Sequence, residues 1–209
     1  MYYDFAYYLE DYLASGAIAM NLILNSLSSL WGIAMYVLTA LGLYTIAKRR
    51  SIHHAWLAWI PGINSWLVGC ISDQYRYVAK GQIKSKRKSL LTLSIVQMAL
   101  ILAFIAALTV TIFCGVESAS YYTGYSRVMS DIMVPLIVTL GLLLPMAGVG
   151  IAKMVIYFMA MYDIYTSCSP DNNVLFLVMS IIFRVTEPFF IFFNRNNDKG
   201  MPPRKVNYQ

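Results

Sequence analysis

The stretch LLTLSIVQMALILAFIAALTVTIFC, residues 90–114, decides the fold class, because it is long, apolar and free of charged side chains. A helix needs about 20 such residues to cross the hydrocarbon core of a bilayer. Two other apolar runs of at least this length cover 16–46 and 132–165, the second interrupted by two prolines and by Lys153. These runs predict an all-α polytopic membrane protein with three long transmembrane helices.

The composition agrees with this class and excludes a soluble globular protein. Of the 209 residues, 59% are hydrophobic and only 12% are charged, whereas soluble domains carry about 25% charged residues. Three scattered cysteines form neither a disulfide framework nor a metal motif. The acidic amino terminus, with Asp4, Glu10 and Asp11, lacks the positive charge of a signal peptide. We therefore expect the first hydrophobic segment to remain in the mature protein.

The basic residues predict the sidedness of the chain. Nine of the sixteen Lys and Arg residues lie between the first two runs, several of them in a basic loop over 73–89. Because cytoplasmic loops are enriched in Lys and Arg, this loop is predicted to be cytoplasmic. The acidic amino terminus and the Tyr-rich segment 115–130 are then outside. The basic tail, 195–209, prefers the cytoplasm.

Two shorter hydrophobic segments, 55–72 and 174–194, are predicted to dip into the membrane and return as re-entrant or interfacial segments. Proline removes a helical donor and glycine tolerates a reversal, so Pro61-Gly62 and Glu187-Pro188 are the expected breaks. The alternative is four spans, with 174–194 crossing fully, plus one interfacial segment. Three tryptophans of the first segment suit the interfacial depth and are predicted anchors: Trp56, Trp59 and Trp66.

An internal repeat within one membrane domain, 1–209, is a further hypothesis. A shift of 118 residues aligns 32–63 with 150–181, giving nine identities over 32 positions without a gap. Internal repeats are common in membrane folds, although apolar sequences also match one another easily.

Polar side chains in the first half of the first run, between Asn21 and Ser29, predict a face that packs on protein.

Ionisable side chains in apolar segments are functional candidates because their burial in lipid is costly. Four residues form this candidate intramembrane polar site: Lys153, Asp163, Arg184 and Glu187. Arg184 and Glu187 are three residues apart, which favours a self-neutralising pair. Lys153 needs an acid from another segment, either Glu187 or Asp163, in a structural pair or in a site for an anion or a proton.

The basic cluster before the second span is predicted to contact anionic lipid head groups through Lys84, Lys86, Arg87 and Lys88. The adjacent His53 and His54 diverge on a helix and do not predict a metal site. No catalytic motif, phosphate-binding loop or dinucleotide fingerprint is present. We therefore expect no enzyme activity, no cofactor and no nucleic-acid partner.

Two blocks resemble a known family: AKRRSIHHAWLAWIPGINSWLVGCISDQYRY at 47–77 and YDIYTSCSPDNNVLFLVMSIIFRVTEPFFIFFNRNNDKGMPPRK at 162–205. The family consists of small polytopic membrane proteins of unknown function from anaerobic Gram-positive bacteria. The resemblance implies a bacterial plasma membrane and a shared fold, and brings no catalytic residue. The sequence thus favours a non-enzymatic subunit that binds lipid and another membrane protein or a second copy. The alternative is a small oligomeric transporter or channel.

Overall fold

The computed structural model describes the backbone of residues 2–83, 85–121 and 125–202, and the side chains of 16–83, 85–116 and 133–202. Within these ranges every regular element is helical, as predicted. The elements are α1 (Tyr2–Arg49), η1 (Ala55–Trp59), α2 (Asn64–Lys80), α3 (Lys86–Tyr121), α4 (Tyr125–Gly141), α5 (Leu143–Cys168), η2 (Pro170–Asn172), α6 (Asn173–Ile182), η3 (Arg184–Thr186) and α7 (Glu187–Asn194).

Three helical stretches are long and apolar enough to cross a membrane: Gly16–Arg49, Lys86–Val116 and Met133–Cys168. They coincide with the three predicted runs, which confirms that part of the fold prediction. The third stretch joins α4 to α5 with a break only at Leu142, whose N–H still donates to the carbonyl oxygen of Val138 at 3.1 Å. The two helices therefore continue one another.

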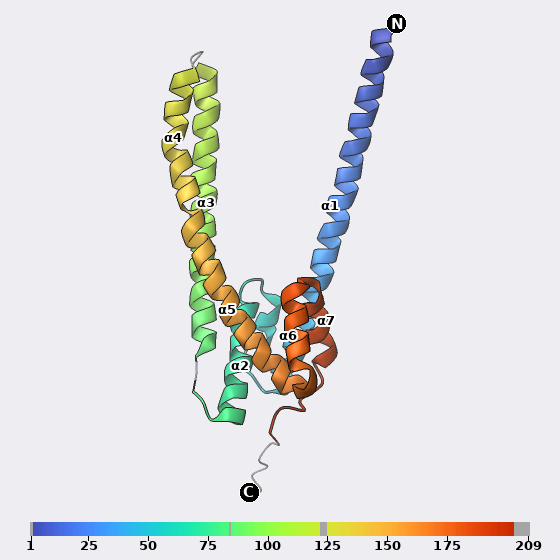
Figure 1. Ribbon diagram of the computed structural model, residues 1–209, viewed down its shortest axis with the longest axis vertical. Coiled ribbons are helices and arrows are strands. Elements are labelled where there is room, and N and C mark those ends of the chain that lie inside the picture. Colours follow the sequence, from blue (N-terminus) through green and yellow to red (C-terminus); the bar gives the residue numbers. More distant parts are fainter. Residues whose placement is uncertain (1, 84, 122–124, 203–209) are drawn as a thin grey trace.

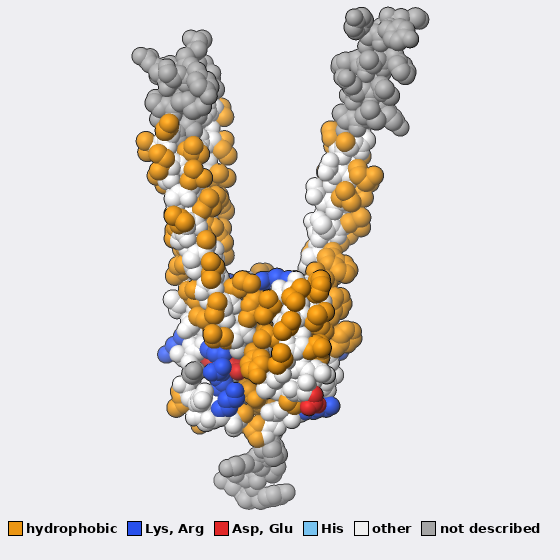
Figure 2. Space-filling model, in the orientation of Figure 1, with side chains coloured by type: hydrophobic (Ala, Val, Ile, Leu, Met, Phe, Trp, Pro, Cys, Tyr) orange, Lys and Arg blue, Asp and Glu red, His pale blue; other side chains and the backbone are white. Residues whose placement is uncertain are grey.

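The molecule has two arms that diverge from a lower body (Figure 1). One arm, here the α1 arm, is residues 16–34 of α1, all of them exposed. The other is formed by α3 and α4, joined by a hydroxyl contact of 3.1 Å between Thr111 and Thr139. Open space separates the arms in the space-filling view (Figure 2). The polar face predicted to pack on protein lies in the α1 arm and contacts nothing else in the described chain.

The lower body holds the hydrophobic core, between the carboxyl-terminal halves of α1 and α5, the start of α3, and the short helices α2, α6 and α7. Its buried side chains are Leu43, Ile46, Ala47, Ala58, Leu67, Val68, Ile71, Leu90, Ala160, Met161, Ile164, Tyr165, Cys168 and Ile191. The packing is reciprocal, because α1 packs against α7 and α5 packs against α2. Helix α1 thus contacts a short helix that follows α5 in the chain, and α5 contacts a short helix that follows α1. The proposed sequence repeat itself stays a prediction.

The two Pro-broken segments are helix–turn–helix units. The first consists of η1, a turn at Pro61-Gly62 and α2, with Gly62 at a φ of 84° that favours glycine. The second consists of α6, η3 and α7, so the break precedes Glu187 and Pro188 occupies the first turn of α7. At 1.5 Å per residue, α6 and α7 are about 15 and 12 Å long. Neither reaches across a core about 30 Å thick, so the alternative fourth span has no continuous helix.

The predicted basic loop 73–89 is largely helical, which corrects that boundary. Helix α2 continues to Lys80 and α3 already begins at Lys86.

The described part of the carboxyl-terminal tail is bound to the lower body. Asp198 forms ion pairs with Arg49 at 3.0 Å and Arg50 at 2.9 Å, and the N–H of Gly200 donates to the carbonyl oxygen of Ser167 at 3.1 Å.

Candidate functional site

Helix α2 organises the polar side chains of the lower body. Its first half is apolar and buried, and its second half carries Ser72, Asp73, Gln74 and Arg76. Ser72 and Arg76 are four residues apart and share one side of the helix, whereas Asp73 and Gln74 point to other sides. One side meets α5, a second meets the start of α3, and a third lines an open polar pocket.

The side toward α5 contains a buried ionic cluster around Asp163. One carboxylate oxygen, Oδ2, accepts hydrogen bonds from Ser72 Oγ at 2.6 Å, Arg76 Nε at 2.6 Å and Lys86 Nζ at 2.7 Å. The Asp163 side chain is fully buried, and those of Arg76 and Lys86 are 16% and 10% exposed. Two cations face one carboxylate here, so this ionic cluster carries one net positive charge.

The side toward α3 fixes the start of that helix. The carboxylate of Asp73 accepts hydrogen bonds from the backbone N–H of Lys86 at 2.9 Å and of Arg87 at 3.1 Å. An acidic side chain at a helix amino terminus pairs with otherwise unbonded N–H groups and with the helix dipole. Gly69, one turn earlier, permits the approach, because a Cβ there would lie 2.6 Å from the Cα of Arg87.

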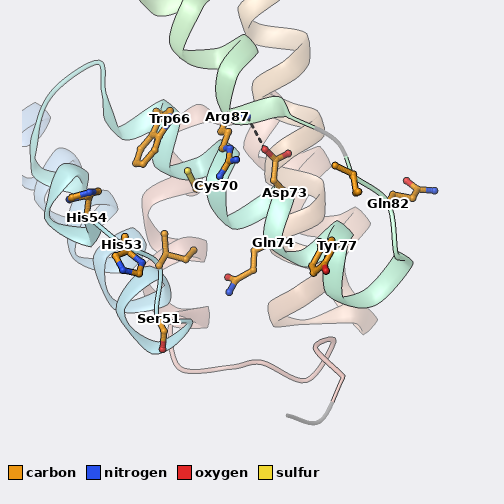
Figure 3. Close-up of a pocket in the computed structure, with 12 residues that line it drawn as sticks. Ser51, His53, His54, Trp66, Cys70, Asp73, Gln74, Tyr77, Gln82 and Arg87 are labelled. Atoms are coloured by element: carbon orange, nitrogen blue, oxygen red, sulfur yellow. Dashed lines mark hydrogen bonds between the residues drawn. The ribbon is translucent and has the colours of Figure 1, made fainter. Parts of the chain in front are cut away.

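The third side of α2 lines a polar pocket of about 510 Å³. Figure 3 shows Trp66, Cys70, Gln74 and Tyr77 along α2, between the loop that carries the two histidines and the start of α3. Burial raises the pKa of the Cys70 thiol to about 11, although the charge of Arg87 opposes this shift. The thiol is therefore protonated at neutral pH, so the pocket does not present a thiolate nucleophile.

The structure disperses the four residues of the predicted intramembrane polar site. Asp163 lies in the ionic cluster just described. Glu187 is buried and accepts a hydrogen bond from the hydroxyl of Tyr157, while Arg184 is exposed. Within the described ranges, Arg184 and Glu187 form no ion pair with each other. Lys153 has no hydrogen bond or ion pair there, so its predicted pairing with Glu187 or Asp163 is absent.

The predicted head-group contacts and anchors fall in several environments. Arg87 and Lys88 are exposed, whereas the ammonium of Lys86 is committed to Asp163. Lys84 lies outside the described residues. Among the predicted anchors, Trp56 and Trp59 are 56% and 42% exposed, and Trp66 lines the polar pocket.

Reasoning from sequence missed Ser72, Arg76 and Lys86 as partners of Asp163. They are 91, 87 and 77 residues away from it along the chain. One signal was available. Asp163 lies near one end of its apolar run, and the positive-inside rule places that end on the same side as the basic connection between the first two spans. The charge rule could therefore have indicated that cations of that connection and the acid at that end lie at the same surface, but the prediction paired Lys153 with either Glu187 or Asp163 instead.

No protein-family model, curated protein or solved structure matches this chain. The family resemblance drawn from the two sequence blocks therefore stays a prediction. The described part of the chain contains no group of His, Cys, Asp and Glu residues that could hold a metal ion.

Proposed function

We propose that the chain is a non-enzymatic integral membrane subunit that binds a transmembrane helix of another membrane protein along its α1 arm. The observation that carries this proposal is a polar stripe whose side chains have no partner outside α1 in the described part of the chain. The stripe consists of Asn21, Asn25, Ser28 and Gly32, all exposed. Asn21 donates to the carbonyl oxygen of Ala17 in its own helix at 2.9 Å, and Ser28 donates to that of Asn25 at 2.9 Å.

The stripe lies on the same face of α1 that is buried further along the helix. Residues spaced by three or four share one face of a helix, and this series continues from Gly32 through Tyr36 and Leu43. The Tyr36 hydroxyl contacts the carbonyl oxygen of Ala58 at 3.5 Å, and Leu43 is fully buried in the lower body. The stripe is therefore the upward continuation of the buried face.

A polar face of this kind is costly against lipid and favourable against protein. The amide of Asn25 has no side-chain hydrogen bond within the described residues, and unpaired amides in an apolar medium cost several kcal/mol. Hydrogen bonds between membrane helices contribute about 0.6–2 kcal/mol each, and small residues such as Gly32 let helices approach closely. A partner helix with small and hydrogen-bonding side chains meets both needs.

The proposal includes an orientation in a bacterial plasma membrane. The amino terminus is outside, the start of α3 with Arg87 and Lys88 is cytoplasmic, and the three long helices cross. The two helix–turn–helix units, 55–80 and 173–194, lie in the cytoplasmic leaflet as re-entrant or interfacial segments. The positive charge around the α2–α3 connection supports this sidedness.

Site-directed photo-crosslinking in native membranes tests the proposed function. A photoreactive amino acid at position 25 is expected to give a discrete protein adduct, and the same group at position 23, on the opposite face, is expected to give none. The adduct formed from position 25 should be lost in Asn21→Leu and kept in Ser26→Leu, which alters a polar residue outside the stripe. Equal adducts from both positions, or lipid adducts alone, contradict the proposal.

Lys153 favours a second candidate function, a small oligomeric transporter or channel. It lies within the third membrane-spanning stretch, is half-buried and has no ion pair in the described ranges. Ionisable residues in membrane-spanning helices are rare and often mark the paths of ions or substrates. Flux of small anions into liposomes that falls in Lys153→Met and persists in Leu144→Met supports this candidate. Flux that is absent from the unaltered protein, or unchanged by Lys153→Met, contradicts it.

A further inference from the structure

A shallow groove of about 390 Å³ crosses the exposed face of α5 near the ionic cluster. It is lined by Arg76 of α2, by Val155, Phe158, Met159 and Tyr162 of α5, and by Leu177 of α6. The groove is therefore polar at the end formed by Arg76 and Tyr162, and apolar along α5 toward Val155. From Tyr162 to Val155 it follows α5 for about 10 Å at 1.5 Å per residue.

Arg76 is held in place for a ligand at the polar end. Its Nε donates to Asp163 at 2.6 Å, and its two terminal nitrogens have no hydrogen bond to the described part of the chain. A guanidinium with free terminal N–H groups matches two oxygens of a phosphate. The hydroxyl of Tyr162 is also without a hydrogen bond there, so it offers a further donor.

The charge at this end has the sign that an anion requires. Arg76 and Lys86 together exceed Asp163 by one positive charge. Neighbouring Asp73 keeps its charge, but its carboxylate accepts hydrogen bonds from the N–H groups of Lys86 and Arg87, where the positive end of the α3 dipole offsets part of it. Figure 2 shows Lys and Arg side chains low on the molecule beside a continuous hydrophobic surface. A ligand that fits both parts has an anionic head and an apolar chain.

We propose that this groove binds an anionic phospholipid, with the phosphate on Arg76 and Tyr162 and one acyl chain over Phe158 and Val155. The site differs from the basic cluster before α3, where Lys86 is committed to Asp163. It is also independent of the α1 arm, so it stands or falls separately from the proposed function.

Native mass spectrometry of the full chain in detergent, titrated with phosphatidylglycerol or with phosphatidylcholine of the same acyl chains, tests the site. The unaltered protein is expected to retain phosphatidylglycerol about tenfold more tightly, because phosphatidylcholine adds to the same phosphate a cation that the net positive charge of the ionic cluster repels. Val155→Trp fills the groove without touching the ionic cluster, and it should abolish this preference. Leu144→Trp is the matched control, because Leu144 is 80% exposed on the same helix outside the groove, and it should keep the preference.

Arg76→Lys keeps the charge and loses the planar fork, so phosphatidylglycerol binding should fall about tenfold, the effect of a lost charge-assisted hydrogen bond. If this variant does not fold, the Val155→Trp arm still decides the matter. Equal retention of both lipids by the unaltered protein overturns the proposal. So does unchanged phosphatidylglycerol binding in Val155→Trp, or inorganic phosphate that binds as tightly as the lipid.

Discussion

Replacing Asp163 by Asn removes the negative charge that holds α2, α3 and α5 together, while the volume of the side chain is kept. Lys86 and Arg76 then remain as cations without a counter-charge, with side chains only 10% and 16% exposed. Breaking a buried ion pair costs about 3–5 kcal/mol. Because both long side chains can turn toward the surface, we expect the lower end, a loss of about 3 kcal/mol in the free energy of unfolding.

Equilibrium unfolding in mixed micelles, followed by far-ultraviolet circular dichroism, measures this loss. Asp171→Asn is the matched control, because Asp171 is exposed in η2, and it should change the free energy by no more than about 0.5 kcal/mol. The double variant Asp163→Asn with Lys86→Met removes one stranded cation, so its loss should be smaller than the sum of the single losses by about 1 kcal/mol. Additive losses, or an Asp163→Asn protein as stable as the control, refute the reasoning.

Two further predictions concern close packing and thiol chemistry. Gly42→Ala places a Cβ 2.6 Å from Cγ2 of the buried Ile191, so thermal unfolding should shift to lower temperature, with an overpacking cost of about 1–3 kcal/mol. Gly32→Ala meets no atom within 4 Å and should stabilise its helix by up to about 1 kcal/mol, so equal shifts in the two variants contradict the packing argument. In a variant whose Cys70 is the single cysteine, alkylation by iodoacetamide should be slow at neutral pH and accelerate up to a pKa of about 11. A midpoint near 8.5, the ordinary value for a thiol, contradicts the burial of Cys70.

The structure confirms the features that were predicted from the composition of long stretches of sequence. It corrects the ends of individual helices, which depend on local contacts. The three spanning stretches follow from runs without charge, so they were visible in residues 90–114 and in the two other runs. The break at Pro61-Gly62 was also predictable, because proline and glycine act locally on the backbone. The extension of α2 to Lys80 was not, since residues 73–80 resemble a loop in composition. The helix there is supported by contacts of Asp73 with α3 and of Arg76 with α5.

The ionisable residues of the candidate site were predictable from the sequence, but their partners were not. Lys153, Asp163 and Glu187 were recognised as ionisable groups in apolar segments, since their positions are written in the sequence. Their partners depend on helix rotation and on which helices are neighbours. Glu187 is bonded to Tyr157, and Lys86 reaches Asp163 across 77 residues, while Lys153 makes no pair in the described ranges.

The sequence by itself determined the all-helical class, the three spanning stretches and the concentration of positive charge between the first two of them, because hydrophobicity and charge act through the surrounding solvent. Only the tertiary structure decided that 174–194 is two short helices and that α2 carries the polar contacts of the lower body. It also showed that the polar stripe of α1 continues the face that is buried in the lower body. These features depend on side chains that meet from distant parts of the chain, and such contacts are set by packing in three dimensions.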